Sequence, residues 1–183
     1  EKVNLILNQF QPATRLNDLS DPTEYIDNSI VTTAKILAFI KNKCSKINKV
    51  LYTSSSSVYG NNKSCVEADL PKPLSLHATL KLANEKLVSQ FCLAEGIDYT
   101  IARVFNMYGG YDEFSIVSKI IKAYKNHQSI LLINNGSAVR DFIHISDVVE
   151  AYKAILVSSG IDVVNIASRL ETKFLYMCIY KTI

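Results

Sequence analysis

The sequence predicts an α/β fold built on a parallel sheet. Short apolar, β-favouring segments at 3–7, 49–54 and 99–105 alternate with longer segments of helical periodicity at 21–43 and 75–95. Strands that alternate with helices of this length are typical of parallel sheets, which are buried on both faces. We therefore expect these helices to pack on the faces of one sheet.

The composition is that of one globular domain. The chain has 183 residues, of which 48% are hydrophobic and 20% charged, and this length is enough to bury one core. The 20 basic and 17 acidic residues are scattered and give a net charge of +3 without a basic run. We therefore expect no nucleic-acid surface, whereas acidic ligands remain open.

The cysteines and histidines show no metal-binding pattern. The four cysteines lack C-x-x-C spacing and the chain has three histidines, so we expect reduced thiols and no metal. No apolar stretch approaches the ~20 residues of a membrane span, and no leader pattern is present. We expect a cytoplasmic protein that does not enter a membrane.

Two helices are expected to cover the sheet. Asp21, Pro22 and Glu24 form a capping arrangement that starts a helix running to about Lys43. Its predicted apolar stripe is Ile26, Ile30, Ala34, Leu37 and Ile40. The second helix is predicted from Ser75 to Glu95, ended by Gly96. Its predicted buried residues are Leu80, Ala83, Leu87 and Phe91.

The rest of the chain predicts a smaller α/β part. A helix is expected at about 114–125, followed by a hairpin of 130–133 and 137–145 around Asn135-Gly136. A helix from Asp147 to about Val157 and a short strand at 163–166 come next. The final residues, 171–183, contain an apolar segment at 174–180 without a helical stripe.

The segment Leu51–Lys81 has the layout of a functional site. Its strand ends in four serines, and the helix that follows carries His77 and Lys81. Ligands of open α/β sheets bind beyond the carboxyl ends of the strands, and helix positions i and i+4 project from one face. We expect the serines, His77 and Lys81 to converge. The alternative is that Lys81 forms an exposed ion pair with Glu85, worth ~0.3–0.5 kcal/mol.

The motif SSSSVYG followed by a lysine-bearing helix resembles the NAD-dependent epimerase/dehydratase family, extended short-chain dehydrogenases that act on nucleotide sugars. Three more blocks resemble this family in its own order: PTEYIDN at 22–28, RVFNMYG at 103–109 and RDFIHISD at 140–147. The resemblance covers about residues 8–168. It implies a partial Rossmann-type sheet at 1–110, a mixed substrate lobe at 111–170 and an atypical tail at 171–183.

The resemblance also implies roles for individual residues. In the family pattern Tyr-x-x-x-Lys, the phenolate takes a sugar hydroxyl proton, while the lysine lowers its pKa and holds the nicotinamide ribose. A serine orients the hydroxyl. The matching catalytic residues here are Ser55, His77 and Lys81, with histidine in the place of tyrosine. Because an imidazole reaches less far from the backbone than a phenol, we expect a direct contact with the sugar hydroxyl to fail unless a water bridges it.

The remaining implied residues bind ligands. Asn28, Lys81 and Phe105 match cofactor-binding positions, and Asn106 and Arg140 match positions that hold the phosphates of the substrate. From the residues alone, Asn28 can equally be a solvated asparagine. Arg140 can equally be an exposed partner of Asp141.

The expected reaction class depends on the residues between the implied catalytic Ser55 and the pair Tyr59-Gly60. Dehydratases of the family carry an acidic residue there, because elimination of water needs a general acid and base. This chain has Ser56 and Ser57. We therefore expect hydride transfer with epimerisation or simple oxidation, rather than dehydration.

The sequence predicts an NAD-dependent nucleotide-sugar epimerase or dehydrogenase that is truncated at both ends. Its six glycines form no G-x-G-x-x-G cluster, so we expect this chain alone to bind NAD or NADP weakly and to have low activity. The alternative is a non-catalytic remnant or a dimerising fragment. The resemblance implies a homodimer in which the helices at 21–43 and 75–95 form a four-helix bundle.

Overall fold

The computed structural model describes residues 3–8, 22–43, 46–62 and 65–173. The chain divides into two compact units. The first comprises Glu1–Val104 and Tyr152–Asn165, and the second comprises Phe105–Ala151 and Ile166–Ile183.

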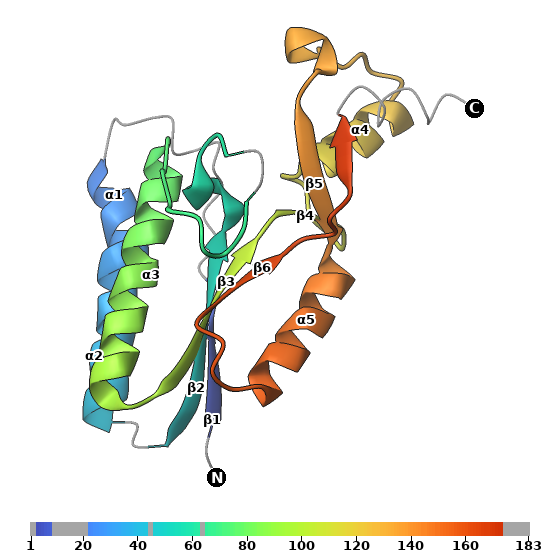
Figure 1. The fold of residues 1–183 in the computed structure, drawn as a ribbon. Helices are drawn as coiled ribbons and strands as arrows, with labels where there is room; N and C mark the ends of the chain where they lie inside the picture. The colour runs from blue at the N-terminus through green and yellow to red at the C-terminus, as the bar shows by residue number, and fades with distance from the viewer. Residues whose placement is uncertain (1–2, 9–21, 44–45, 63–64, 174–183) are drawn as a thin grey trace. The chain divides into compact units, whose positions relative to one another are not determined.

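The first unit is built on a four-stranded sheet in the order β1-β2-β3-β6 (Figure 1). Its strands are β1 (Val3–Leu7), β2 (Ile47–Ser55), β3 (Asp98–Val104) and β6 (Val163–Ile166). β2 runs parallel to β1 and to β3, and Val50 lies opposite Leu5 and Tyr99. The predicted α/β fold with a parallel sheet is confirmed.

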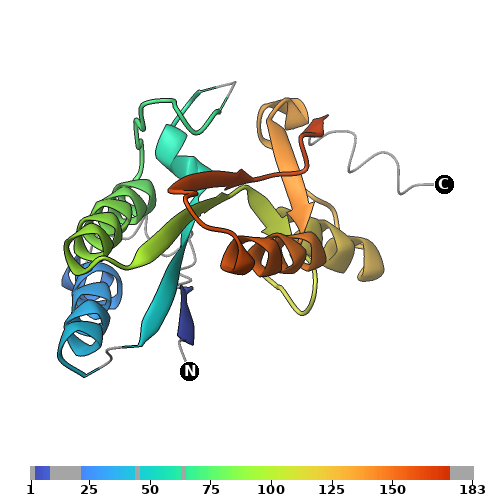
Figure 2. The ribbon, with the colours of Figure 1, turned by 60° about the horizontal axis from the view of Figure 1, so that its bottom comes forward.

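Helices of the first unit lie together on one face of this sheet (Figure 2). They are α1 (Pro22–Ile26), the π-helical turn η2 (Asp27–Val31), α2 (Thr32–Lys43) and α3 (Leu76–Glu95). Gly96 ends α3 in the left-handed conformation, with φ of 64°, as predicted. Because side chains alternate along a strand, Thr53 faces the opposite side, where its hydroxyl bonds Tyr152 of α5 (Ile145–Val157) at 2.6 Å.

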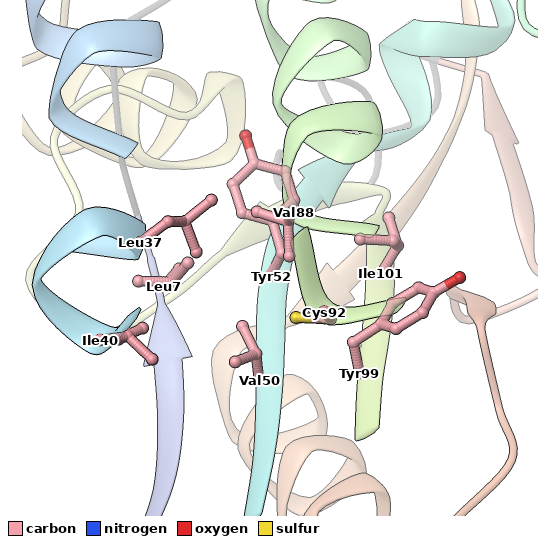
Figure 3. Packing of buried hydrophobic residues seen from close by; sticks show 9 residues of the cluster. All are labelled: Leu7, Leu37, Ile40, Val50, Tyr52, Val88, Cys92, Tyr99 and Ile101. Atoms are coloured by element: carbon pink, nitrogen blue, oxygen red, sulfur yellow. The ribbon is translucent and has the colours of Figure 1, made fainter. Parts of the chain in front are cut away.

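The core between the sheet and these helices is apolar along most of the strands and becomes polar near the carboxyl ends of β2 and β3. Figure 3 shows the apolar cluster, formed by Leu7, Leu37, Ile40, Val50, Tyr52, Val88, Cys92, Tyr99 and Ile101. On β2 the row Val50, Tyr52 continues to Ser54, and on β3 the row Tyr99, Ile101 continues to Arg103. Ser54 and Arg103 are paired in register, so the two rows become polar at the same level.

The first helical segment buries a different face from the predicted stripe. A π turn holds about one residue more than an α turn and rotates the side chains that precede it about the helix axis. Ile26, which precedes the turn, is therefore 45% exposed, and Ser29, within the turn, is buried. After the turn, Thr33 is buried and Ala34 is exposed. Downstream of the turn, Leu37 and Ile40 are buried as predicted. The predicted cap at Asp21 lies outside the described residues.

The buried face of α3 also differs from its predicted stripe. Leu80 is buried as predicted, but Ala83 is exposed, and Leu87 and Phe91 are half-buried. The residues buried with Leu80 are Ala78, Lys81, Asn84, Glu85, Val88 and Cys92. The predicted stripe differs because it counted only apolar residues as buried, whereas Lys81, Asn84 and Glu85 are buried with partners in the interior.

The second unit contains a three-stranded sheet in the order β4-β5-β7. Its strands are β4 (Asn106–Tyr108), β5 (Val139–His144) and β7 (Glu171–Lys173). β5 is parallel to β4 and antiparallel to β7. Helix α4 (Ile116–Lys125) begins after Ser115, whose hydroxyl accepts from the Ser118 amide.

The predicted hairpin around Asn135-Gly136 is wrong. Asn134, Asn135 and Gly136 all have positive φ, from 49° to 64°, and wind the chain into the short turn η4 (Ile133–Gly136). The turn was recognised, but residues 130–132 form no strand beside it. β5 instead pairs with β4 and with β7, which lies in the predicted tail. The apolar segment at 174–180 lies outside the described residues.

In the described part of the chain, no helix is both long and apolar enough to cross a bilayer.

Candidate functional site

The serine cluster forms where β2 ends. Ser55 is the last residue of β2 and caps the short helix η3 (Ser56–Tyr59), because its hydroxyl accepts from the Ser57 amide at 3.2 Å. Gly60 follows η3 with φ of 67°, and a side chain there would clash with the carbonyl oxygen of Lys72. The Tyr-Gly of the motif thus allows the loop at Lys72 to pack directly over the end of η3.

Lys81 reaches the same end of β2 from α3. Its ammonium donates to the carbonyl oxygen of Thr53 at 2.8 Å and lies 5.3 Å from the ring centroid of Tyr52. Lys81 is only 8% exposed. Burial, opposed by the negative charge of Glu85, lowers the pKa of Lys81 to about 8.

His77 lies one helical turn before Lys81 and contacts the serine cluster through Ser57. The Ser57 hydroxyl is 3.4 Å from His77 Nδ1 and donates to the Ser55 hydroxyl at 3.0 Å. Burial and then the charge of Lys81 lower the pKa of His77, so the ring is held neutral near pH 7. The structure therefore brings Ser55, His77 and Lys81 to one place, with Ser57 between the first two.

Tyr52 does not replace the tyrosine that the family pattern has at position 77. It is the tyrosine beneath the Lys81 ammonium, but it is fully buried. Burial raises its pKa far above that of a free phenol, so the phenolate is disfavoured. Figure 3 shows its ring among the apolar side chains of the core.

A buried ion pair joins Glu85 of α3 to Arg103 of β3 next to the site. The sequence analysis did not predict it. Glu85 accepts from Arg103 Nη2 at 2.8 Å and from Arg103 Nε at 3.1 Å, and it also accepts from the Ser54 hydroxyl. The two charged side chains are 5% and 6% exposed. Burial alone would lower the pKa of Arg103, but its bonds to Glu85 and Tyr59 raise it overall. The alternative of an exposed pair of Lys81 with Glu85 does not hold, because both side chains are buried and Glu85 is paired with Arg103.

The other expected ligand-binding residues are distributed over both units. Asn28 lies in η2 and is exposed. Phe105 lies between β3 and β4 in the second unit, where its amide donates to Ile166. Asn106 donates to the carbonyl oxygen of Asp141 at 2.9 Å.

Arg140 is exposed on β5 of the second unit. Its guanidinium donates to the carbonyl oxygen of Val139 at 2.8 Å. The alternative pairing with Asp141 is not formed, because the Asp141 carboxylate accepts from the amides of Ser168 and Arg169. The outer donors of Arg140 thus face solvent.

The cysteines and acidic residues offer no metal centre in the described part of the chain. No group of three or more metal-ligating side chains occurs there. Cys65 and Cys92 are free thiols, and burial raises the pKa of Cys92 to about 12.

A model of the NAD dependent epimerase/dehydratase family matches residues 1–167. The chain belongs to this family. Among its relatives, protein CapI of Staphylococcus aureus is 33% identical over 158 residues, which are 82% of this chain and 46% of the relative. UDP-glucuronate 4-epimerase of Thermodesulfobacterium geofontis is 29% identical over 152 residues, which are 81% of this chain and 46% of the relative.

Solved structures of the epimerase/dehydratase family match the fold. UDP-N-acetylglucosamine 4-epimerase from Methanobrevibacter ruminantium has a TM-score of 0.85 at 26% identity, over 96% of this chain and 58% of that one. UDP-glucuronic acid 4-epimerase from Bacillus cereus, in complex with UDP-glucuronic acid and NAD, has a TM-score of 0.78 at 28% identity, over 85% and 51%. This chain thus spans about half the length of the relatives that it matches.

We expect the buried pair of Glu85 and Arg103 to be much more costly to break than an exposed one. Removing one partner of a buried ion pair costs about 3–5 kcal/mol, whereas an exposed pair contributes about 0–1 kcal/mol. Glu85→Ala should therefore lower the free energy of unfolding several times more than Lys41→Ala, which breaks the pair of Lys41 with Glu95. Urea unfolding measures both.

The double variant Glu85→Leu with Arg103→Met sharpens this test, because apolar replacement of both partners leaves no unpaired charge. It should be more stable than Glu85→Ala or Arg103→Ala. Equal losses for Glu85→Ala and Lys41→Ala would contradict the assignment of a buried pair.

The burial of Lys81 predicts a pH-dependent stability. Its pKa is about 8 in the folded chain and 10.5 in the unfolded chain, so between these values the unfolded chain binds more protons and stability rises with pH. Lys81→Met removes this titration. Measured by urea unfolding, the free energy of unfolding of Lys81→Met minus that of the wild type should be largest below pH 8 and smaller at pH 10. A difference that stays constant from pH 7 to 10 would show that the amine is solvated.

Proposed function

We propose that this chain carries the sugar-hydroxyl site of an NAD-dependent nucleotide-sugar epimerase or dehydrogenase. The observation that carries the proposal is the convergence of Ser55, His77 and Lys81 at the carboxyl end of β2. Ligands of open α/β sheets bind at such a place. Two of the similar proteins named above are a UDP-glucuronate 4-epimerase and a UDP-N-acetylglucosamine 4-epimerase, which supports a nucleotide sugar as the substrate.

In the proposed reaction, each site residue handles a proton or a charge. The Ser55 hydroxyl accepts a hydrogen bond from the sugar hydroxyl and orients it. His77 is the base, and its lowered pKa keeps a ring nitrogen ready to accept a proton. Lys81 holds the imidazole neutral by its charge. The nicotinamide, when bound, supplies the hydride acceptor that oxidises the sugar carbon.

Part of this chain fits the cofactor. The Lys81 ammonium lies at the carboxyl end of β2 and suits the hydroxyls of a ribose, and we propose that Asn28 and Phe105 complete the contacts. The acidic residue that distinguishes NAD from NADP follows the glycine-rich loop by about 20 positions, and the 183 residues contain no G-x-G-x-x-G. We therefore propose weak binding of NAD by these residues alone.

Arg140 and Asn106 are the proposed contacts for the substrate phosphates. A guanidinium presents a planar set of donors that matches phosphate oxygens. Arg140 suits this role because it is exposed and is not neutralised by Asp141. Asn106 donates one N–H of its amide group to the Asp141 carbonyl oxygen, which leaves the second N–H to donate to a phosphate oxygen.

One observation favours the alternative of a non-catalytic remnant. Position 77 carries an imidazole, which is shorter than the phenol of the family pattern, and its hydrogen bond to Ser57 is long at 3.4 Å. A site that has lost its direct base would keep its fold, since Glu85 and Arg103 do not depend on position 77.

Substitution of His77 tests the proposed function. With a panel of nucleotide sugars and NAD, the purified protein is assayed for NADH formation, which reports a dehydrogenase, and for conversion of the nucleotide sugar, which reports an epimerase. A positioned base contributes about 10²–10⁴-fold, so His77→Gln should lower the rate at least a hundredfold. The matched control is Ser56→Ala, which changes a neighbouring hydroxyl that makes no hydrogen bond in the described structure.

His77→Tyr decides between the enzyme and the remnant. A lower rate than the wild type supports His77 as the working base. A large gain would mean that the site is damaged and that tyrosine repairs it. Absence of both NADH formation and conversion of the nucleotide sugar in every variant would refute the proposed function.

The proposal includes a homodimer. Phe39 on α2 and Leu93 on α3 are exposed apolar residues on the two helices that the family resemblance assigns to a dimer. Light scattering of the purified chain should show self-association at micromolar concentration, and Phe39→Glu should weaken it because a charge in an apolar contact is costly. A wild-type chain that remains monomeric would contradict the dimer.

A further inference from the structure

Ser57 lies where dehydratases of the family carry an acidic residue, and the roles implied for Ser55, His77 and Lys81 leave it without a task. Its hydroxyl lies 3.4 Å from His77 Nδ1 and 3.0 Å from the Ser55 hydroxyl. Its backbone amide also donates to the Ser55 hydroxyl at 3.2 Å. The cap of η3 thus fixes the distance between Ser55 and Ser57.

We propose that Ser57 is the bridging hydroxyl through which His77 exchanges a proton with Ser55. The inference rests on the proposed function, in which Ser55 contacts the hydroxyl of the sugar. It assigns to Ser57 the task of extending the reach of the imidazole.

The Ser57 bridge compensates for the shorter reach of the histidine side chain compared with that of tyrosine. A base must lie within hydrogen-bond reach of the proton that it takes, directly or through one intervening group. In the family pattern a phenol oxygen reaches the substrate directly. Here the imidazole nitrogen reaches only as far as the Ser57 hydroxyl, and that hydroxyl in turn contacts the Ser55 hydroxyl.

The hydrogen-bonding capacity of the two serines suits such a relay. A hydroxyl has one donor and two acceptor sites and rotates about its C–O bond. Ser55 accepts from the Ser57 amide with one lone pair. Its second lone pair accepts from the sugar. In the structure the Ser57 hydroxyl donates to Ser55, and in the relay both hydroxyls rotate so that Ser55 donates to Ser57. Ser57 then donates to His77 Nδ1.

Each proton in the step is accounted for. The sugar O–H bond breaks and its proton moves to Ser55, the Ser55 proton moves to Ser57, and the Ser57 proton moves to His77 Nδ1. The two serines end as neutral hydroxyls and His77 becomes an imidazolium. The electron pair left on the sugar oxygen forms the carbonyl as a hydride leaves the sugar carbon for the nicotinamide.

The surroundings favour His77 as the end of the relay. Burial and the Lys81 charge hold the ring neutral, and the nearby Glu85 is committed to Arg103 and Ser54. The hydroxyl of Ser56, the adjacent serine of the same motif, has no hydrogen-bond partner among the described residues. The chain therefore offers a matched control one residue away.

The first experiment needs no activity. Nitrogen NMR of labelled histidine in the 183-residue chain reports whether His77 Nδ1 is hydrogen-bonded. Ser57→Ala should shift the Nδ1 resonance of the neutral ring, Ser57→Thr should restore it because threonine keeps the hydroxyl, and Ser56→Ala should leave it unchanged. Identical spectra for the wild type and Ser57→Ala would overturn the proposal.

The second experiment is kinetic and separates this inference from the proposed function. Ser57→Ala should lower kcat at least tenfold with little change in KM, and Ser57→Thr should recover it. Combining Ser57→Ala with His77→Gln should cost no more than His77→Gln alone, because both remove the same path.

The outcomes are distinguishable. If His77→Gln loses activity while Ser57→Ala retains it, the relay is wrong and the proposed function stands. If the wild type transfers no hydride, the proposed function fails, and a Ser57-dependent Nδ1 signal still supports the hydrogen-bonded link.

Discussion

The ion pair of Glu85 with Arg103 joins three elements where the apolar core of the first unit ends. Glu85 comes from α3, Arg103 from β3, and Ser54, which donates to Glu85, from β2. Taking two charges out of water costs several kcal/mol per ion. Here the cost is offset by paired bonds between a planar guanidinium and a carboxylate, with Ser54 and Tyr59 as further partners. Without either partner, the interior would hold an uncompensated charge.

This pair determines how the site above it is assembled. On α3, Glu85 lies one turn beyond Lys81 and two turns beyond His77, so its bond to Arg103 fixes the position of the helix along β3. On β2, the bond to Ser54 holds the residue directly before Ser55. The Glu85 carboxylate thus holds both halves of the site in place: the serines through Ser54, and His77 and Lys81 through the helix that carries them. A second bond, from Asn84 to Ser29 at 2.8 Å, holds α3 against η2.

The sequence predicted the parts of the site that depend on local order along the chain. Strand β2, the serines after it and the capped helix with His77 and Lys81 are all set by spacing and by turn and cap residues. The role of Glu85 was missed because its partner is distant in sequence and depends on the parallel register that sets Ser54 beside Arg103. For Ser57 the sequence shows only that a serine stands where dehydratases of the family carry an acidic residue. Its place between His77 and Ser55 follows from the cap of η3, which spacing alone does not reveal.

The π-helical turn Asp27–Val31 has a consequence for changes in chain length. The sequence around it carries two possible buried faces, one with Ile26 and Ile30 and one with Ser29 and Thr33, and the wide turn selects the polar one. Deleting a single residue there would not simply shorten a helix. It would restore α-helical geometry, rotate the upstream side chains by about one residue's angle, and carry Ser29 away from Asn84. A one-residue deletion in this segment thus acts as a change of helix face, and loosens the helix that holds His77 and Lys81.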